Sequence, residues 1–308
     1  MKRWRSSGSL LGPFLFLIFI NDLPKCFDKC SLHLYADDTV IYYSGKNVNT
    51  IQTTMDKELK YLATWMRLNK LKVNCGKTVS MLIGTKHMLA KRGNLNLNFN
   101  GVNLSQVKCF KYLGVHVDDE LKWTTHTEHV CKKTGKMISY LGRLKHVVNA
   151  STLKTVYNTA ILPHFDYADI VWQSATKSSL IRIQKLQNRA ARIILKVKPY
   201  EHKSVAVMHD LLDWEMLNKR RKKHTLSLVY KILHNMAPEY LLEKFDPKVS
   251  TYDLRNSGAL ALPKPRTENC KRTFVYCGST HYNDLSLSIK QATSVIQFNK
   301  MLNELNLD

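Results

Sequence analysis

A pair of adjacent aspartates near the start of the chain lies between two short segments that are rich in β-branched and aromatic residues. Residues 31–36 (Ser-Leu-His-Leu-Tyr-Ala) and 39–43 (Thr-Val-Ile-Tyr-Tyr) both have the composition of β-strands. Only Asp37 and Asp38 separate the two segments, so the chain must reverse direction within two residues. This spacing predicts a tight antiparallel hairpin with the two carboxylates at its tip.

The carboxylates of Asp37 and Asp38 have two interpretations. Aspartate is common in turns, so turn chemistry alone is enough to explain the pair. The alternative is a metal site, because a rigid hairpin exposes a carboxylate at a sheet edge. Mg²⁺ binds one or two carboxylates together with water and substrate phosphates, and nucleotidyl transfer uses two such ions. Since adjacent side chains diverge, the two aspartates are not equivalent ligands of one ion.

An imbalance in the sign of the charges indicates the class of partner. The 308 residues contain 47 Lys and Arg against 24 Asp and Glu, which gives a formal net charge of +23. A protein this basic is expected to bind a polyanion, either nucleic acid or an anionic membrane surface. Hydrophobic residues make up 44% of the chain, which is enough for a core and excludes global disorder.

A predicted helix that begins near Ser178 arranges part of this charge in a row. Its cations recur at intervals of three, four and three residues and therefore share one helical face: Arg182, Lys185, Arg189 and Arg192. This face, which we call the cationic row, is either an ordinary solvated surface or a series of contacts to a phosphate backbone.

Three zones follow one another along the chain and predict an α+β fold. Residues 1–123 mix helix and strand signals, residues 124–198 are helical, and residues 199–308 form a C-terminal extension of unknown role. In the first zone, apolar residues at helical spacing predict a helix over 51–66. Asn100-Gly101 lies between alternating apolar residues and predicts a second hairpin, because this dipeptide suits a type I′ turn.

Further local signals set expectations for individual elements. The residues from 108 to 117 predict a single strand. Ser151 is the predicted N-cap of a helix that Pro163 is expected to end. Apolar residues at helical spacing predict a last helix over 293–305.

The N-terminus has the outline of a secretory signal peptide, with basic residues before an apolar run over 10–20. The run is shorter than the roughly 20 residues that span a bilayer, and Gly12 and Pro13 interrupt it. We therefore favour a buried helix that begins near Pro13, since proline is tolerated in a first helical turn. The alternative is a secreted or membrane-associated protein. The buried-helix interpretation predicts that the protein has no membrane partner.

Cysteine usage indicates a reducing compartment. The seven cysteines are odd in number, scattered in spacing and without a C-x-x-C motif, so a disulfide framework is not expected. Cys270, Cys277 and His281 form a partial zinc-ligand set. No fourth ligand at finger-like spacing accompanies them, and semi-buried thiols are the alternative.

Several motifs occur in a fixed order around the predicted hairpin. The central motif is Tyr35-Ala36-Asp37-Asp38 between apolar strands. The flanking motifs are Gly8-Ser9-Leu10-Leu11-Gly12-Pro13 and Ile20-Asn21-Asp22-Leu23-Pro24 upstream, and Trp65-Met66-Arg67-Leu68-Asn69, Lys77-Thr78, Phe110-Lys111-Tyr112-Leu113-Gly114-Val115 and Leu121-Lys122-Trp123 downstream. In this order the motifs resemble the reverse transcriptases of non-LTR (LINE-type) retrotransposons, of the jockey and chicken-repeat kind. The resemblance covers residues 6–123 well, residues 124–198 look like a thumb, and the tail resembles the C-terminal region of such elements.

The resemblance implies a truncated right-hand polymerase palm with a helical thumb, and it assigns roles to single residues. Asp37 and Asp38 would be the catalytic metal-binding pair, with Mg²⁺ or Mn²⁺ as cofactor. Gly8, Tyr35 and Lys77 would form the nucleotide or template pocket. The primer grip would be Tyr112, Leu113 and Gly114. The cationic row would follow the backbone of an RNA template paired with a DNA primer.

Departures from the family pattern leave two hypotheses for function. In this family, a strand upstream of the glycine helix carries another metal-binding aspartate, and here only Asp22 and Asp28 precede the hairpin. The family's usual Gln before the glycine is replaced by Ser7. One hypothesis is an RNA-directed DNA polymerase domain, probed by primer extension; the other is an inactive remnant that binds nucleic acid. We expect no polymerase activity from this chain alone.

The resemblance also implies an intracellular location. The basic block Lys219–Lys223 is a candidate nuclear-import signal, although short basic blocks are common. The oligomeric state and the preferred template are not indicated by any pattern in the sequence.

Overall fold

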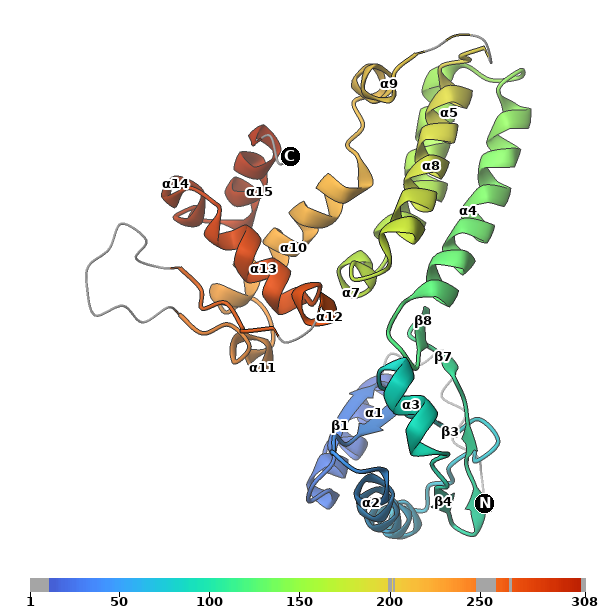
Figure 1. Cartoon of the computed structure of the whole chain (residues 1–308), viewed down its shortest axis with the longest axis vertical. Helices are drawn as coiled ribbons and strands as arrows, with labels where there is room; N and C mark the ends of the chain where they lie inside the picture. Colours follow the sequence, from blue (N-terminus) through green and yellow to red (C-terminus); the bar gives the residue numbers. More distant parts are fainter. Residues whose placement is uncertain (1–10, 199–200, 202, 248–258, 266–267, 306–308) are drawn as a thin grey trace. The chain divides into compact units, whose positions relative to one another are not determined.

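The computed structural model describes residues 11–198, 201, 203–247, 259–265 and 268–305, and Figure 1 shows the order of their elements. The chain divides into two compact units. One contains residues 1–111 and 118–121, and the other contains residues 112–117 and 122–308. No helix within the described ranges is long and apolar enough to cross a membrane.

The first unit contains the hairpin predicted over residues 31–43. Strand β1 (Ser31–Tyr35) pairs antiparallel with β2 (Asp38–Tyr42), and the register places Tyr35 opposite Asp38. Leu32 and Leu34 are half-buried and pack against the core of this unit. One face of the hairpin is therefore fixed by hydrophobic contact, and the other is left to solvent.

Helix α2 (Val48–Leu68) contributes a long buried face to the same core. Asn47 caps the helix, because its side-chain oxygen accepts a hydrogen bond from the Asn49 N–H at 3.0 Å. The helix predicted over 51–66 is confirmed, and its apolar stripe buries Ile51, Leu59 and Leu62. The short helix η1 (Leu23–Cys26) adds the fully buried Leu23 to this cluster.

Helix α1 (Leu11–Ile20) confirms the helix predicted around Pro13 but not its predicted burial. Ile20 is the buried residue of this helix, whereas Phe14 and Ile18 are 60% and 59% exposed. The helix is apolar on all sides, so contact along one side leaves its other apolar side chains in solvent.

Two further strand pairs and a short helix also belong to the first unit. The parallel pair is β3 (Val79–Ser80) with β6 (Ser105–Gln106), and the antiparallel pair is β4 (Asn98–Phe99) with β5 (Val102–Asn103). Helix α3 (Lys86–Arg92) lies between β3 and β4 in the chain. The hairpin predicted at Asn100-Gly101 is confirmed, with φ angles of 51° and 82° at its two turn residues.

The segment predicted as a single strand over 108–117 is two strands. β7 (Cys109–Tyr112) pairs with β8 (Val115–Asp118), and Leu113 and Gly114 form the turn between them. The prediction of one strand was wrong because the strand-like composition continues through the turn. The division between the two units passes through this hairpin.

In the second unit, α4 (Thr124–Leu144) and α8 (Lys177–Ile194) pack against each other and form the centre of the larger core (Figure 1). Ile138 and Leu141 of α4 are buried, as are Ile183 and Ile194 of α8. The predicted start of α8 near Ser178 is confirmed, because the Thr176 side chain caps the helix by accepting a hydrogen bond from the Ser179 N–H.

The chain between α4 and α8 corrects two predicted helix boundaries. Helix α5 (Ala150–Val156) is capped by Asn149, whose side chain accepts from the Thr152 N–H at 2.8 Å, so the N-cap is not Ser151. Pro163 does not end the helix. The chain continues through the π-helical turn η2 (Tyr157–Ile161), and Pro163 lies in the first turn of α6 (Leu162–Asp166), where its missing N–H has no helical partner to bond. Helix α7 (Asp169–Trp172) follows.

Helix α10 (Leu217–Leu233) contributes to both cores of the second unit. Its first residue, Leu217, packs with the α4–α8 core, to which α9 (Val205–Leu212) also belongs. Its later residue Tyr230 lies in a second core and stacks on Phe298 with ring centroids 4.3 Å apart. The remaining helices are α11 (Glu239–Leu242), α12 (Glu268–Lys271), α13 (Phe274–Asn283), α14 (Leu287–Lys290) and α15 (Val295–Glu304).

Helix α15 confirms the last helix predicted over 293–305. The domain boundaries predicted at residues 123 and 198 stay predictions.

The different burial of two isoleucine side chains on α8 predicts how much each one contributes to the free energy of unfolding. Ile183→Ala removes a fully buried side chain and should lower the free energy of unfolding by about 2–5 kcal/mol, because it leaves a cavity in the larger core. Ile181→Ala is the control, since Ile181 lies on the same helix and is 46% exposed. Its expected effect is below about 1 kcal/mol. Urea unfolding of the full chain measures both values, and equal losses would contradict the assigned packing.

Candidate metal site and nucleic-acid interface

The tip of the β1–β2 hairpin differs in detail from the prediction. Its two turn residues are Ala36 and Asp37, whereas Asp38 is the first residue of β2 and pairs with Tyr35. Ala36 has φ of 52°, in the left-handed region that a tight reversal requires. The two carboxylates therefore start from different backbone environments, one from a turn and one from a strand.

The register of the hairpin decides which side chains reach solvent. Tyr35 and Asp38 are directly opposite each other, so they lie on the same face of the sheet, and both are exposed. Farther from the tip, His33 stacks on Tyr42 with ring centroids 5.3 Å apart, and a 3.2 Å hydrogen bond joins the His33 Nε2 and the Tyr42 hydroxyl. These cross-strand contacts stiffen the exposed face on which Asp38 lies.

A buried carboxylate holds the chain that leads into β1. Glu58 of α2 is 0% exposed and accepts hydrogen bonds from the N–H groups of Asp28 at 3.0 Å and Lys29 at 3.3 Å. The same carboxylate, together with burial as the larger cause, raises the pKa of the Cys30 thiol to about 11. The start of β1 is thus tied to α2 by charge-assisted hydrogen bonds as well as by hydrophobic contact.

Asp37 and Asp38 fit a divalent cation in chemistry and exposure. Both side chains are exposed, and neither has an ion-pair or hydrogen-bond partner among the described residues. Hard oxygen donors open to solvent are the ligands that Mg²⁺ prefers. Among those residues, no third His, Cys, Asp or Glu ligand atom clusters with these two carboxylates. The pair therefore supplies part of a coordination shell, and the remaining ligands would be water or phosphate oxygens.

Two other residues predicted for the nucleotide or template pocket, Lys77 and Tyr35, are exposed. Lys77 is exposed in a turn, where its N–H donates to the Asn74 carbonyl at 3.0 Å. Tyr35 is 64% exposed beside the hairpin tip. Gly8 lies outside the described residues. Asp37, Tyr35 and Lys77 all belong to the first unit.

The predicted primer-grip residues form a defined turn in the second unit. Tyr112 ends β7, and Leu113 and Gly114 have φ angles of 45° and 84°. Two successive left-handed residues make a tight reversal, and a residue without Cβ adopts the second of these angles without strain. The Leu113 carbonyl accepts a hydrogen bond from the Tyr167 hydroxyl at 2.6 Å. Sequence reasoning missed Tyr167, which is 54 residues away from Leu113 in the chain.

The four residues of the cationic row are all exposed on α8. They lie opposite the buried side of that helix, which includes Ile183, Ala190 and Ile194. Helices α4 and α8 together contain nine Lys and Arg residues and one carboxylate, that of Glu128. The packed pair therefore has a strongly positive surface, which is the electrostatic requirement for binding a phosphate backbone.

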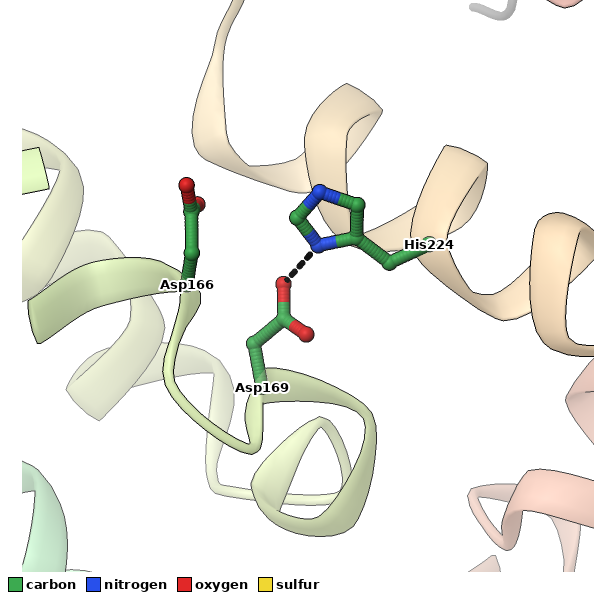
Figure 2. Close-up of side chains that lie close together, drawn as sticks. All are labelled: Asp166, Asp169 and His224. Carbon is green, nitrogen blue, oxygen red and sulfur yellow. Dashed lines mark hydrogen bonds and ion pairs between the residues drawn. The ribbon is translucent and has the colours of Figure 1, made fainter. Parts of the chain in front are cut away.

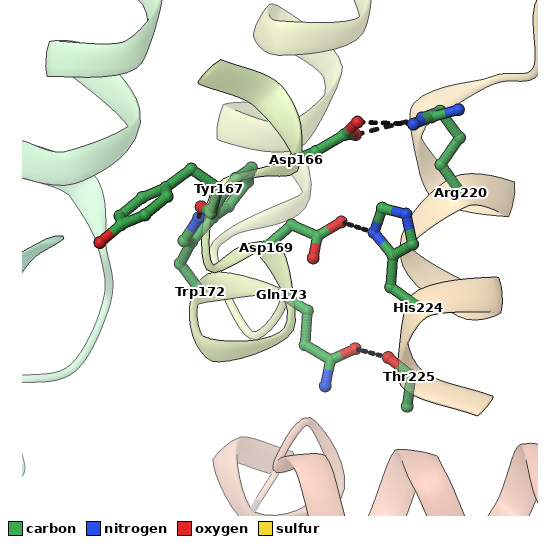
Figure 3. A network of polar contacts seen from close by, with 8 residues as sticks. All are labelled: Asp166, Tyr167, Asp169, Trp172, Gln173, Arg220, His224 and Thr225. Atoms are coloured by element: carbon green, nitrogen blue, oxygen red, sulfur yellow. Dashed lines mark hydrogen bonds and ion pairs between the residues drawn. The ribbon is translucent and has the colours of Figure 1, made fainter. Parts of the chain in front are cut away.

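A second cluster of titratable side chains, which the sequence did not indicate, joins α6 and α7 to α10 (Figure 2). The ligand atoms of Asp166, Asp169 and His224 lie within 4.8 Å of one another and form the group in the described part of the chain that has metal-binding spacing. Figure 3 shows that these groups already have partners. Asp166 binds the Arg220 guanidinium with two hydrogen bonds of 3.1 and 2.5 Å, and Asp169 lies 2.7 Å from His224 Nδ1.

These contacts identify the cluster as a charge network that joins helices. Arg221, which is buried, lies over the Trp172 ring at 5.6 Å and adds another cation next to Asp169. A divalent cation at this position would compete with two arginines and an imidazole for the carboxylates. The network cannot be found from sequence, since 54 or 55 residues separate the partners.

The network also changes the interpretation of the basic block at Lys219–Lys223. Arg220 pairs with Asp166, Arg221 is buried, and Lys223 bonds Glu215 and Asn303. Much of the block is therefore engaged in contacts within the fold. The partial zinc set of Cys270, Cys277 and His281 is not a cluster with metal-binding spacing in the described ranges, and the Cys277 thiol donates to the Lys271 carbonyl.

Comparisons with known proteins identify the family to which the part of the chain containing this hairpin is similar. Residues 3–117 match the family model described as reverse transcriptase (RNA-dependent DNA polymerase). The match contains the β1–β2 hairpin and its aspartates. No solved structure matches the chain.

Curated relatives show which kind of reverse transcriptase the chain is similar to. The chain is 31% identical over 236 residues to a probable RNA-directed DNA polymerase from transposon BS of Drosophila melanogaster, a match that covers 73% of this chain and 26% of the relative. It is 23% identical over 198 residues to the RNA-directed DNA polymerase from mobile element jockey of the same species, covering 61% of this chain and 21% of the relative. A putative 115 kDa protein in the type-1 retrotransposable element R1DM of that species is 26% identical over 191 residues, or 58% of this chain and 18% of the relative.

Residues 3–117 therefore belong to the reverse transcriptase family, and the chain is homologous to the RNA-directed DNA polymerases of LINE-type retrotransposons. The chain spans about a quarter or less of the length of these relatives.

The charge network predicts a pH dependence of stability. The hydrogen bond with Asp169 raises the pKa of His224 above its ordinary value of 6.5. The stabilisation is therefore complete below about pH 6.5 and is lost as the pH rises through the folded-state pKa. His224→Gln removes this contribution, so the difference in unfolding free energy between wild type and variant should shrink as the pH rises.

Urea unfolding between about pH 5.5 and pH 8.5 measures this difference. His146→Gln is the control, because His146 is exposed in the same unit. A difference for His224→Gln that stays constant over this range would contradict the assigned pairing.

Proposed function

We propose that this chain carries the catalytic hairpin of an RNA-directed DNA polymerase and binds an RNA template paired with a DNA primer. The main support is the position of Asp37 and Asp38, which are exposed at the tip of a rigid hairpin inside the region that matches the reverse transcriptase family. The fold class proposed is a right-hand polymerase palm followed by a helical thumb.

Asp37 is the proposed ligand of catalytic Mg²⁺ or Mn²⁺, since its carboxylate projects from the turn itself. When bound, the ions would activate the attacking primer hydroxyl and stabilise the leaving pyrophosphate. Asp38 is fixed by strand pairing and would support the site, with a weaker contact to metal. Both residues act by holding negatively charged oxygens at a defined edge of the sheet.

Lys77 and Tyr35 are the proposed contacts to the incoming nucleotide or the template, together with Gly8. Lys77 offers an exposed ammonium group to a triphosphate. Tyr35 offers an exposed ring on the same hairpin as the aspartates. Gly8 would let the backbone approach the nucleotide closely, which is the physical use of a residue without Cβ.

The second unit is proposed to hold the template–primer duplex. The turn at Leu113 and Gly114, with Tyr112, is the proposed primer grip. The cationic row on α8 is the proposed contact to the phosphate backbone. Two observations support this role: all four cations are exposed on one face of α8, and the α4–α8 pair contains a single carboxylate. Backbone contacts of this kind position a duplex without reading its sequence.

A second candidate function is nucleic-acid binding without polymerase activity. The observation that favours it is the incomplete ligand set, because no third acidic, His or Cys ligand atom within the described ranges clusters with Asp37 and Asp38. A primer-extension assay on poly(rA)/oligo(dT) with Mg²⁺ or Mn²⁺ separates the two candidates. Incorporation that Asp37→Asn abolishes supports the polymerase, and binding without any incorporation supports the second candidate.

An intracellular site of action is part of the same proposal, because template RNA and nucleoside triphosphates are found inside cells. A nuclear location has less support, since Arg220, Arg221 and Lys223 of the basic block are engaged within the fold.

Asp37→Asn should strongly weaken divalent-cation binding at the hairpin. Neutralising the turn carboxylate removes the main charge that would hold the ion, while the neutral side chain keeps its size. The expected result is loss of Mn²⁺-induced line broadening at residues 35–39 in NMR spectra, with at least a tenfold weaker apparent affinity, the factor for roughly 1.4 kcal/mol.

Asp22→Asn is the matched control, because Asp22 is also an exposed aspartate of the first unit. Broadening at the hairpin that is unaffected by Asp37→Asn would count against the metal site.

Changing the cationic row to glutamate should weaken duplex binding and its dependence on salt. The substitutions are Arg182→Glu, Lys185→Glu, Arg189→Glu and Arg192→Glu. If each cation neutralises one phosphate, the slope of log K against log salt should become shallower by about 3–4, and affinity should fall by at least a hundredfold at low salt. Fluorescence anisotropy between about 50 and 200 mM salt measures both quantities.

A control with the same change in net charge uses exposed lysines of the C-terminal region: Lys231→Glu, Lys244→Glu, Lys264→Glu and Lys300→Glu. If the two sets weaken binding equally, net charge accounts for the effect and the row has no specific role.

A further inference from the structure

Tyr167 lies in the short connection between α6 and α7 and makes contact with the turn of the β7–β8 hairpin. Its hydroxyl donates to the Leu113 carbonyl at 2.6 Å. A Cβ built on Gly114 would lie 3.1 Å from Tyr167 Cε1 and 3.3 Å from its hydroxyl oxygen, so the ring packs closely against the glycine. The hydroxyl and the ring thus contact both residues of the turn.

The turn that Tyr167 contacts has an unfavourable backbone conformation. Leu113 has φ of 45°, a left-handed angle that is unfavourable for a residue with a Cβ. Such a conformation persists when neighbouring contacts determine it. The hydrogen bond from Tyr167 engages the carbonyl of this strained residue. Its ring packs so closely on Gly114 that a Cβ at that position would have to displace the ring by a few tenths of an ångström.

The backbone of Tyr167 is itself held by two hydrogen bonds. Its N–H donates to the Pro163 carbonyl at 2.9 Å, and its carbonyl accepts from Trp172 Nε1 at 3.0 Å. Trp172 is completely buried in the larger core. The backbone of Tyr167 is therefore fixed relative to α6 and α7.

The residues on either side of Tyr167 are fixed to α10. Asp166 binds Arg220 and Asp169 binds His224, whereas the Tyr167 ring points to the opposite side of the connection (Figure 3). The ring remains 55% exposed beside the turn. The segment 166–169 thus connects α10 on one side with the Leu113–Gly114 turn on the other.

We propose that Tyr167 is a positioning residue for the primer terminus, which acts by holding the Leu113–Gly114 turn in its binding conformation. This inference rests on the proposed function, in which that turn contacts the end of the primer. Tyr167 fixes the turn through the Leu113 carbonyl, and the charge network behind it fixes Tyr167.

The test compares two nucleic-acid probes on the full chain by fluorescence anisotropy. One probe is an RNA–DNA duplex with a recessed primer 3′ end, and the other is a continuous duplex of the same length. Wild type should prefer the recessed end. Tyr167→Phe keeps the ring against Gly114 and removes the hydroxyl, so the preference should fall about fivefold, the factor for one net hydrogen bond. Affinity for the continuous duplex and the melting temperature should stay unchanged.

Hydrogen exchange provides the second measurement, without nucleic acid. Tyr167→Phe should speed amide exchange at residues 113–115 and leave exchange in α8 unchanged. Tyr140→Phe is the matched control, because Tyr140 is a tyrosine of the same unit that is 59% exposed and whose hydroxyl bonds no other described residue. It should alter neither the preference nor the exchange.

The possible failures are distinguishable. A wild-type chain without preference for the recessed end overturns the primer-grip assignment, and the positioning role falls with it. A wild-type preference that Tyr167→Phe leaves intact overturns the positioning role alone. An equal loss of affinity for both probes also overturns it, because the hydroxyl would then support binding in general.

Discussion

The side-chain alternation of a β-strand is the constraint on which the proposed catalytic site depends. Leu32 and Leu34 of β1 pack toward the core, so Tyr35 and its partner Asp38 must face solvent. A shift of register by one residue would turn the aspartate inward and the leucines outward, which the hydrophobic effect opposes. The same contacts that fold the hairpin therefore orient its carboxylate, and Glu58 adds a fixed starting point for β1.

Burial separates the positive charges into two groups with different roles. The cationic row on α8 is exposed, and its positive charge is available to a polyanion. Arg220 and Arg221 on α10 instead lie against Asp166, Asp169 and Trp172. Buried charges require partners of opposite sign, and the Arg220–Asp166 and His224–Asp169 contacts join α10 to α6 and α7. Net charge alone does not distinguish the two groups.

Local patterns in the sequence predicted many elements but misplaced several boundaries. The helices over 51–66 and 293–305 and the hairpin at Asn100-Gly101 were predicted, because periodicity and turn chemistry act over a few residues. Pro163 was expected to end a helix, yet it occupies the first turn of a new one. A proline ends a helix only where the N–H that it lacks would have bonded a carbonyl of the preceding turn. The surrounding chain decides whether such a carbonyl is present.

The exposure of α1 and the role of Tyr167 could not be predicted for a related reason. An apolar sequence shows that a helix avoids water but not which partner covers it, and in α1 several apolar side chains remain exposed. Tyr167 has an ordinary sequence context, and its significance lies in a hydrogen bond to Leu113, 54 residues away. Contacts at such separation depend on how helices pack, which short-range patterns do not encode.

The sequence by itself determined the hairpin with its aspartates, the excess of positive charge and the spacing of the cationic row, because each follows from neighbouring residues and backbone geometry. Only the tertiary structure decided which cationic side chains remain exposed and which pair with Asp166 and Asp169. It alone placed Tyr167 against the Leu113–Gly114 turn. The physical reason is that burial and long-range hydrogen bonds depend on the packing of distant segments, which is set when the whole core forms.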